Sequence, residues 1–137
     1  MRVAVTGSTG FTGGHTLKEL IASGHEPVAL VRDRSKLDAV RRLHDLPEIT
    51  CVEGDITIRD SLKPLFTDCE AVIHTAAVAA TGRGAIPLIE RVNAVGSKNV
   101  LELSTKAGLD PIVYVSCLLY TSPSPRDLST SRMPSSA

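Results

Sequence analysis

The stretch that decides the fold is Thr6-Gly7-Ser8-Thr9-Gly10-Phe11-Thr12-Gly13, which contains three glycines in eight residues. Residues 2–6 before it are a short apolar run typical of a buried strand. Residues 12–23, which overlap its end, place Leu17 and Ile21 one turn apart, as on one face of a helix. A glycine-rich turn between a strand and a helix favours a loop whose backbone approaches a ligand closely.

The three glycines have separate physical roles in such a turn. Gly7 allows the tight turn, Gly10 lets the backbone approach a pyrophosphate, and Gly13 lets the helix pack on the sheet. The helix that follows offers free N–H groups and the positive end of its dipole to phosphate. We therefore expect a dinucleotide here, the alternative being a glycine-rich connector without a ligand. The residues predicted to contact the cofactor from this stretch are Gly7, Thr9, Gly10, Phe11, Thr12 and Gly13.

The rest of the chain alternates short β-branched runs with helical patterns. Strands are predicted at residues 2–6, 27–31, 49–53, 71–74 and 111–115, and helices at 12–23, 35–43, 58–66 and 88–107. Such alternation is typical of a parallel sheet with crossover helices. The predicted fold is α/β, a Rossmann-type doubly wound parallel sheet of order 3-2-1-4-5, truncated after strand 5.

Composition excludes several classes of protein. The 137 residues carry 15 Lys and Arg against 15 Asp and Glu, so nothing favours an electrostatic nucleic-acid binder. The hydrophobic share of 42% is that of a globular chain. No run approaches the ~18–20 apolar residues of a membrane span. Met1 is followed directly by the first predicted strand, without the pattern of a signal peptide. Together these observations predict a cytoplasmic protein. Three scattered cysteines predict neither a metal site nor a disulfide framework.

The end of the second predicted strand bears on which dinucleotide binds. An acid at this position binds the ribose hydroxyls of NAD, whereas a cation suits the additional phosphate of NADP. The sequence reads Val31-Arg32-Asp33-Arg34, so the strand end carries Arg32, which favours NADP. Asp33 keeps NAD open as the alternative, because a shift of one residue in the strand end would restore an acid there.

Further motifs follow the later strands. They are Gly54-Asp55-Ile56, His74-Thr75-Ala76-Ala77, the helical segment 92–100 with sequence VNAVGSKNV, and Val113-Tyr114-Val115-Ser116. With the glycine turn, these make residues 1–116 similar to the extended short-chain dehydrogenases/reductases. Within them the chain resembles the NAD-dependent epimerase/dehydratase group, and most of all its dihydroflavonol-4-reductase and 3β-hydroxysteroid dehydrogenase branch.

The resemblance implies further cofactor contacts. The Asp55 carboxylate would accept from the adenine amino group, with Ile56 beside it, although Asp55 could instead only cap a helix. The small side chains of Ala76 and Ala77 would let the ribose and nicotinamide pass closely, and Asn93 would bind backbone or position a water. His74 is expected to be a strand-end histidine satisfied by backbone, not a proton donor.

The reacting groups that the resemblance implies are a Tyr, a Lys four residues later and a Ser. No Tyr-x-x-x-Lys occurs: Tyr114 is followed by Leu118, and Tyr120 by Ser124. The family's usual Ser position holds Cys117, which leaves Ser116 as the sole catalytic candidate. We therefore expect the chain alone to show little or no turnover.

Residues 117–137 differ in composition from the rest, with six Ser, three Pro and no Gly. Their start, Cys-Leu-Leu-Tyr-Thr-Ser-Pro-Ser-Pro-Arg-Asp, resembles the translation of a transposase sequencing adapter. The alternative is a natural Ser/Pro-rich disordered tail. The predicted organisation is thus an NAD(P)-binding domain at 1–116 and a non-native tail at 117–137.

These observations favour part of an oxidoreductase that moves a hydride between NADP(H) and a carbonyl or secondary alcohol of a small-molecule substrate. A sugar-nucleotide epimerase or dehydratase, and a non-catalytic dinucleotide-binding redox sensor, are the alternatives. The sequence predicts neither nucleic acid nor membrane as a partner, and it does not indicate an oligomeric state.

Overall fold

A computed structural model describes residues 1–78 and 82–116 of the chain. Five parallel strands form one sheet of order β3-β2-β1-β4-β5, which confirms the predicted doubly wound topology. The predicted tail at 117–137 lies outside the described residues. The strands are β1 (Arg2–Thr6), β2 (Glu26–Val31), β3 (Thr50–Glu53), β4 (Ala71–His74) and β5 (Ile112–Tyr114).

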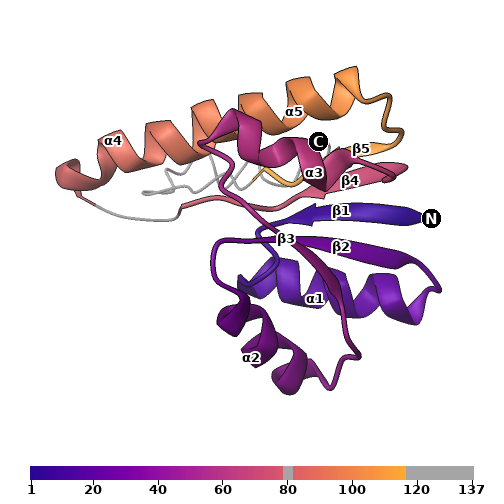
Figure 1. Ribbon diagram of the computed structural model, residues 1–137. Coiled ribbons are helices and arrows are strands. Elements are labelled where there is room, and N and C mark those ends of the chain that lie inside the picture. The colour runs from indigo at the N-terminus through magenta and orange to yellow at the C-terminus, as the bar shows by residue number, and fades with distance from the viewer. Residues whose placement is uncertain (79–81, 117–137) are drawn as a thin grey trace, which may run out of the picture.

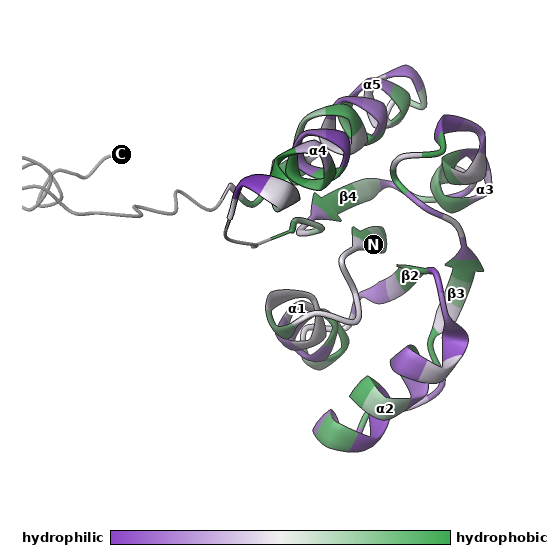
Figure 2. Cartoon of the chain, turned by 90° about the vertical axis from the view of Figure 1, so that its left-hand side faces the viewer, coloured by the Kyte–Doolittle hydropathy of each residue, from purple (hydrophilic) through white to green (hydrophobic). Residues whose placement is uncertain are grey.

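Helices cover both faces of this sheet. Helices α1 and α2 lie on one side of the strands, and α3, α4 and α5 lie on the other (Figures 1 and 2). The α-helices are α1 (Phe11–Ala22), α2 (Arg34–His44), α3 (Lys63–Phe66), α4 (Ile86–Ile89) and α5 (Ser97–Lys106). The 3₁₀ turns are η1 (Arg59–Leu62) and η2 (Arg83–Ala85), and η3 (Glu90–Gly96) is a π-helix between α4 and α5.

Alternate residues of β1, β2, β3 and β4 enter two separate cores, whereas β5 contributes only Ile112 to one of them. In β1, Val3 and Val5 pack with Leu17 on the α1 and α2 side. Ala4, between them, packs with Leu65 and other residues on the α3 and α5 side. Because successive strand side chains point to opposite faces, a strand covered on both faces reads as a continuous apolar run. This is why the strands were predictable from sequence.

The helix predicted at residues 88–107 differs from the structure in its start and its geometry. It begins at Ile86, two residues earlier, and its middle is π-helical. Pro87 lies in the first turn, where the missing N–H would have had no intrahelical partner. Pro64 has the same place at the start of α3, so neither proline breaks its helix.

Within residues 1–78 and 82–116, none of the helices combines the length and apolar character needed to cross a bilayer. The same residues bring together no group of three or more His, Cys, Asp or Glu side chains able to hold a metal ion.

Candidate cofactor-binding site

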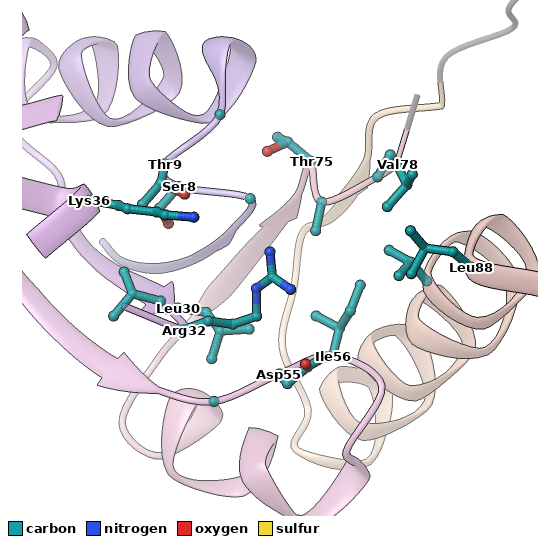
Figure 3. Close-up of a pocket in the computed structure, with 17 residues that line it drawn as sticks. Ser8, Thr9, Leu30, Arg32, Lys36, Asp55, Ile56, Thr75, Val78 and Leu88 are labelled. Atoms are coloured by element: carbon teal, nitrogen blue, oxygen red, sulfur yellow. The ribbon is translucent and has the colours of Figure 1, made fainter. Parts of the chain in front are cut away.

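A cavity of about 440 Å³ lies at the carboxyl ends of β1, β2 and β4. Its position is where the strand order reverses, because β1 pairs with β2 on one side and β4 on the other. In open α/β sheets this is the crevice that binds ligands. Figure 3 shows residues from several segments around it. The predicted residues that line it are Gly7, Thr9, Gly10, Arg32, Asp55, Ile56, Ala76 and Ala77.

The glycine turn is tightly folded, as the sequence predicted. Gly7 has a φ of +70°, and a Cβ there would lie 2.6 Å from Thr75 Oγ1 and 2.7 Å from the Ala76 nitrogen. A Cβ on Gly13 would lie 1.8 Å from the Gly7 carbonyl oxygen. The Gly10 N–H donates to that same oxygen at 3.0 Å. Side chains at Gly7 and Gly13 are therefore incompatible with this turn.

Phe11, Thr12 and Gly13 do not line the cavity. They form the first turn of α1, whose N-cap is Gly10, and no side chain caps it. The first backbone N–H groups of a helix lack intrahelical partners, so this end of α1 can donate hydrogen bonds to an anion. The Phe11 side chain is 84% exposed.

Arg32 and Asp33, which follow the end of β2, take different places in the structure. The strand ends at Val31, and Arg32 reaches into the cavity (Figure 3). Asp33 is the N-cap of α2, where its Oδ1 accepts from the N–H and hydroxyl of Ser35 at 2.9 and 2.8 Å. The hydroxyl hydrogen bond and then the N–H bond hold the pKa of Asp33 below its usual value. Asp33 thus has one carboxylate oxygen engaged at the start of α2, and the residue does not line the cavity.

Two other cations follow Arg32. Arg34 pairs with Glu53 at 2.9 Å and does not line the cavity. Lys36 does line it, as do Ser8 and Thr9 (Figure 3). Among the described residues, neither Arg32 nor Lys36 is in an ion pair. Two exposed cations therefore line the cavity, Arg32 from the β2–α2 connection and Lys36 from the first turn of α2.

Asp55 has one carboxylate oxygen engaged locally. Oδ1 accepts from the N–H and the hydroxyl of Thr57 at 2.9 and 2.8 Å. Burial by itself would raise the pKa of this carboxyl, but the Thr57 hydrogen bonds and the charges of Arg32 and Arg91 outweigh it, so the pKa is lowered. Asp55 is therefore an anionic acceptor at the cavity wall.

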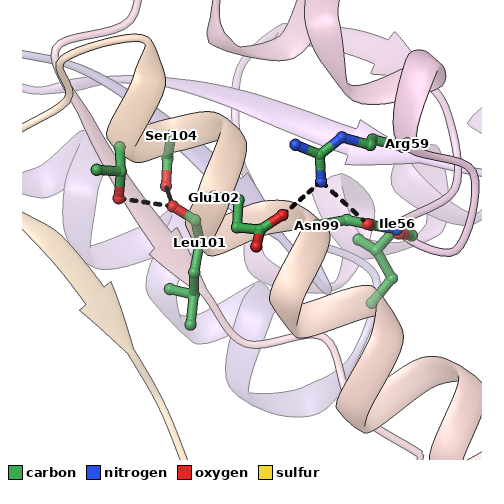
Figure 4. Close-up of polar contacts among 7 residues, drawn as sticks. Ile56, Arg59, Asn99, Leu101, Glu102 and Ser104 are labelled. Carbon is green, nitrogen blue, oxygen red and sulfur yellow. Dashed lines mark hydrogen bonds and ion pairs between the residues drawn. The ribbon is translucent and has the colours of Figure 1, made fainter.

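Ile56 is held in the wall from behind. Gly96 packs so closely that a Cβ there would lie 2.6 Å from Ile56 Cδ1. The Asn99 amide donates to the Ile56 carbonyl oxygen at 2.8 Å. Figure 4 shows Arg59 between Glu102 and Asn99, with nitrogen–oxygen distances of 2.8 and 3.4 Å.

Asn93 does not line the cavity, although the sequence predicted it as a cofactor contact. Its Oδ1 accepts from the Val78 N–H at 2.8 Å, and its Nδ2 donates to the Val78 carbonyl oxygen at 3.0 Å. Val78 does line the cavity. Asn93 thus fixes the backbone of the loop after β4, which matches the expected backbone contact.

The expectation that backbone satisfies His74 is wrong. The ring nitrogens bond to side chains: Nδ1 to the Thr6 hydroxyl and Nε2 to the Ser97 hydroxyl, the latter at 2.8 Å. The ring is fully buried, and burial lowers its pKa to about 4. His74 is therefore neutral at pH 7 and has no acidic proton to donate into the cavity.

Ser116, the catalytic candidate, is exposed and does not line the cavity. Tyr114 stacks on the His74 ring, with centroids 5.3 Å apart. The described residues therefore bring no Tyr, Lys and Ser together at the cavity.

Several lining residues were not among those predicted. Thr75, Gly54 and Val92 lie within motifs quoted above, and Lys36 lies near the start of the helix predicted at residues 35–43. The apolar Leu88 carried no sequence signal that distinguished it from a core residue. The full set is Ser8, Leu30, Val31, Lys36, Gly54, Thr75, Val78, Leu88 and Val92.

Comparison with known proteins is consistent with this geometry. The sequence profile described as "NAD dependent epimerase/dehydratase family" matches residues 3–136. A putative dihydroflavonol 4-reductase of Synechocystis sp. is 35% identical over 112 residues, which are 82% of this chain and 31% of that protein. A UDP-glucose 4-epimerase of Bacillus subtilis is 35% identical over 123 residues, covering 85% of this chain and 36% of that protein.

A solved structure agrees in fold. The UDP-glucose-4-epimerase from Stenotrophomonas maltophila, with bound NAD and formylated UDP-arabinopyranose, superposes with a TM-score of 0.71 at 30% identity, covering 83% of this chain and 36% of that one. The chain spans about a third of the length of these relatives. Reductase and epimerase match equally well, so reaction type is not distinguished. The chain belongs to the NAD-dependent epimerase/dehydratase family and corresponds to its NAD(P)-binding region.

Proposed function

We propose that the cavity binds NADP(H) in preference to NAD(H), and that the protein moves a hydride between this cofactor and a carbonyl or secondary alcohol. The observation that carries the cofactor proposal is the separation of Arg32 from Asp33. Arg32 lines the cavity, while Asp33 is occupied as the cap of α2. A guanidinium at this place pairs with a phosphate in a forked, charge-assisted geometry.

The residues of the chain divide the binding task. The turn at Gly7 to Gly13 offers backbone N–H groups to the pyrophosphate, and Asp55 offers a carboxylate to the adenine amino group. Arg32 and Lys36 face the ribose phosphate. Ala76 and Ala77 leave space for the nicotinamide side. When bound, the nicotinamide supplies the hydride donor or acceptor.

The experiment for the cofactor proposal is a titration of the chain with NADPH and NADH, followed by cofactor fluorescence. The chain has no Trp, so protein emission does not interfere strongly. Wild type should bind NADPH about tenfold or more tightly, because one charge-assisted contact is worth ~1.5–3 kcal/mol. Arg32→Asp should abolish that preference.

Arg34→Asp is the matched control. Arg34 is two residues further on and equally a surface arginine, but it pairs with Glu53 outside the cavity. Its substitution should leave the NADPH preference in place. Equal affinities of wild type for NADPH and NADH, or loss of preference in both variants, would overturn the proposal.

The hydride-transfer part depends on residues beyond those described. The oxidoreductase reading requires a Tyr-x-x-x-Lys about one strand and one helix after Ser116 in the gene. The reductase match supports it, and the epimerase match supports the alternative of a sugar-nucleotide epimerase or dehydratase. Independent reads of the gene across codon 117 test both this and the adapter origin proposed for residues 117–137. A reading frame without the Tyr and Lys would favour the redox-sensor alternative.

A further inference from the structure

Behind the cavity lies a buried polar cluster that the proposed function does not use. It consists of Thr6 at the end of β1, His74 at the end of β4 and Ser97 at the start of α5. Their exposed fractions are 0%, 0% and 5%. None of the three lines the cavity.

The donors and acceptors around the Thr6 hydroxyl determine which ring nitrogen of His74 carries the proton. Thr6 Oγ1 lies 3.2 Å from the Thr75 nitrogen and 3.3 Å from the Ala76 nitrogen, and it accepts from both N–H groups, although the Thr75 N–H is shared with the Thr6 carbonyl oxygen at 3.3 Å. Since a hydroxyl oxygen has two lone pairs, its own hydrogen must serve the third contact, with His74 Nδ1. Nδ1 is then the acceptor, and the proton of the neutral ring is on Nε2, where it donates to Ser97 Oγ at 2.8 Å.

The other tautomer leaves a group unsatisfied. With a proton on Nδ1, the Thr6 oxygen would face three N–H donors, and its hydroxyl hydrogen would lack an acceptor in this buried cluster. Leaving a buried donor unpaired costs about 1–3 kcal/mol. The stacked Tyr114 ring, at an interplanar angle of 21°, packs flat against His74.

The contact at Thr6 positions the cavity wall. The two N–H groups that its hydroxyl oxygen accepts belong to Thr75 and Ala76, which both line the cavity. The same loop touches the glycine turn, because a Cβ on Gly7 would lie within 2.8 Å of three atoms of Thr75 and Ala76. The Thr75 hydroxyl also donates to the Thr6 carbonyl oxygen at 2.7 Å. The loop after β4 and the turn after β1 are thus joined through Thr6.

We propose that His74 is a positioning residue for the dinucleotide: as the Nε2–H tautomer it orients the Thr6 hydroxyl, which holds the Thr75–Ala76 backbone against the glycine turn. The consequence for ligand binding rests on the proposed function. The tautomer and the loop contact do not depend on it.

Two variants separate the two ring nitrogens. His74→Asn places Oδ1 near the former Nδ1 and keeps an acceptor for Thr6. His74→Gln reaches the former Nε2 position and keeps a partner for Ser97 but not for Thr6. Both replace the ring with a smaller amide, so a loss of packing affects both. We expect amide hydrogen exchange at Thr75 and Ala76 to accelerate about tenfold or more in His74→Gln and to stay within about threefold of wild type in His74→Asn.

The affinity for NADPH should follow the same order, weaker by about tenfold in His74→Gln and within about threefold in His74→Asn. Equal effects of the two variants on exchange would overturn the proposal. The ¹⁵N spectrum of histidine-labelled wild type at pH 7 tests the tautomer without any variant. A protonated Nδ1 of His74 would also overturn it. Absence of NADPH and NADH binding by wild type, with the expected tautomer and exchange, would contradict the proposed function and leave the loop contact supported.

Discussion

Adjacent glycines at the start of α1 give the sharpest test of the glycine turn. Gly13 and Gly14 are both buried and both helical, and Ala at either should gain up to ~1 kcal/mol of helix propensity. Their surroundings differ. A Cβ on Gly14 would meet His44 Nε2 at 3.2 Å and Val40 Cγ1 at 3.3 Å, which are side-chain atoms that can shift by a few tenths of an ångström.

A Cβ on Gly13 would meet backbone instead. It would lie 1.8 Å from the Gly7 carbonyl oxygen and 2.6 Å from the Gly7 carbonyl carbon. The shortest usual distance between a non-bonded carbon and oxygen is ~3.3 Å, so α1 and the turn must separate by about 1.5 Å. Overpacking of this kind costs ~1–3 kcal/mol, and here the upper end applies because no rotamer change relieves the overlap. We expect Gly13→Ala to lower the free energy of unfolding by about 2–3 kcal/mol and Gly14→Ala to change it by less than about 1 kcal/mol.

The assay is urea unfolding followed by far-ultraviolet circular dichroism, combined with NADPH titration of each variant. Separation of the helix start from the turn should weaken NADPH binding about tenfold or more in Gly13→Ala and leave it near wild type in Gly14→Ala. Equal unfolding free energies and equal affinities in the two variants would refute the close approach of α1 to Gly7.

Three further results are expected. Burial places the pKa of His74 at about 4, below its usual 6.5, so its contribution to stability is complete above pH 6.5 and is lost as the pH falls toward 4, by up to about 3 kcal/mol. Urea unfolding at pH 7 and at pH 4.5 should therefore show a smaller loss of stability in His74→Asn than in wild type. An equal loss in the two proteins would contradict this role of the histidine. Asn93→Ala removes both hydrogen bonds to Val78 and should lower the free energy of unfolding by about 1–2 kcal/mol. An unchanged free energy of unfolding would contradict the role of Asn93 in fixing the loop after β4. Gly96→Ala pushes Ile56 toward the cavity and should weaken NADPH binding severalfold. The gain in helix propensity should keep the free energy of unfolding within about 1 kcal/mol of wild type. Unchanged affinity would show that Ile56 does not border the ligand.

Much of the fold was readable because its signals are local. Apolar runs alternating with helical periods predicted all five strands and their order. The runs are continuous in β1, β2 and β4 because both faces of these strands are covered. The π-helical stretch Glu90–Gly96 was not predicted. Its residues make contacts with distant segments, such as Asn93 with Val78 and Gly96 with Ile56, and helical periodicity alone does not encode such contacts.

The site was predictable where backbone geometry imposes a residue type. Gly7 and Gly13 are such positions, because a side chain there would overlap backbone. Leu88 and Val92 line the cavity only because the helix passes beside it, so their sequence pattern is that of core residues. The expectation for His74 failed for a related reason: Thr6 and Ser97, its partners, lie 68 and 23 residues away.

The most direct measurement is the ¹H–¹⁵N spectrum of the labelled chain during addition of NADPH. Binding at the cavity should shift the amide signals of Gly7, Gly10, Asp55 and Ala76, which line it. The amide of Gly108, at the opposite end of the sheet after α5, should stay in place. Unchanged signals at saturating NADPH, or shifts confined to other parts of the chain, would contradict the assignment of this cavity to a dinucleotide.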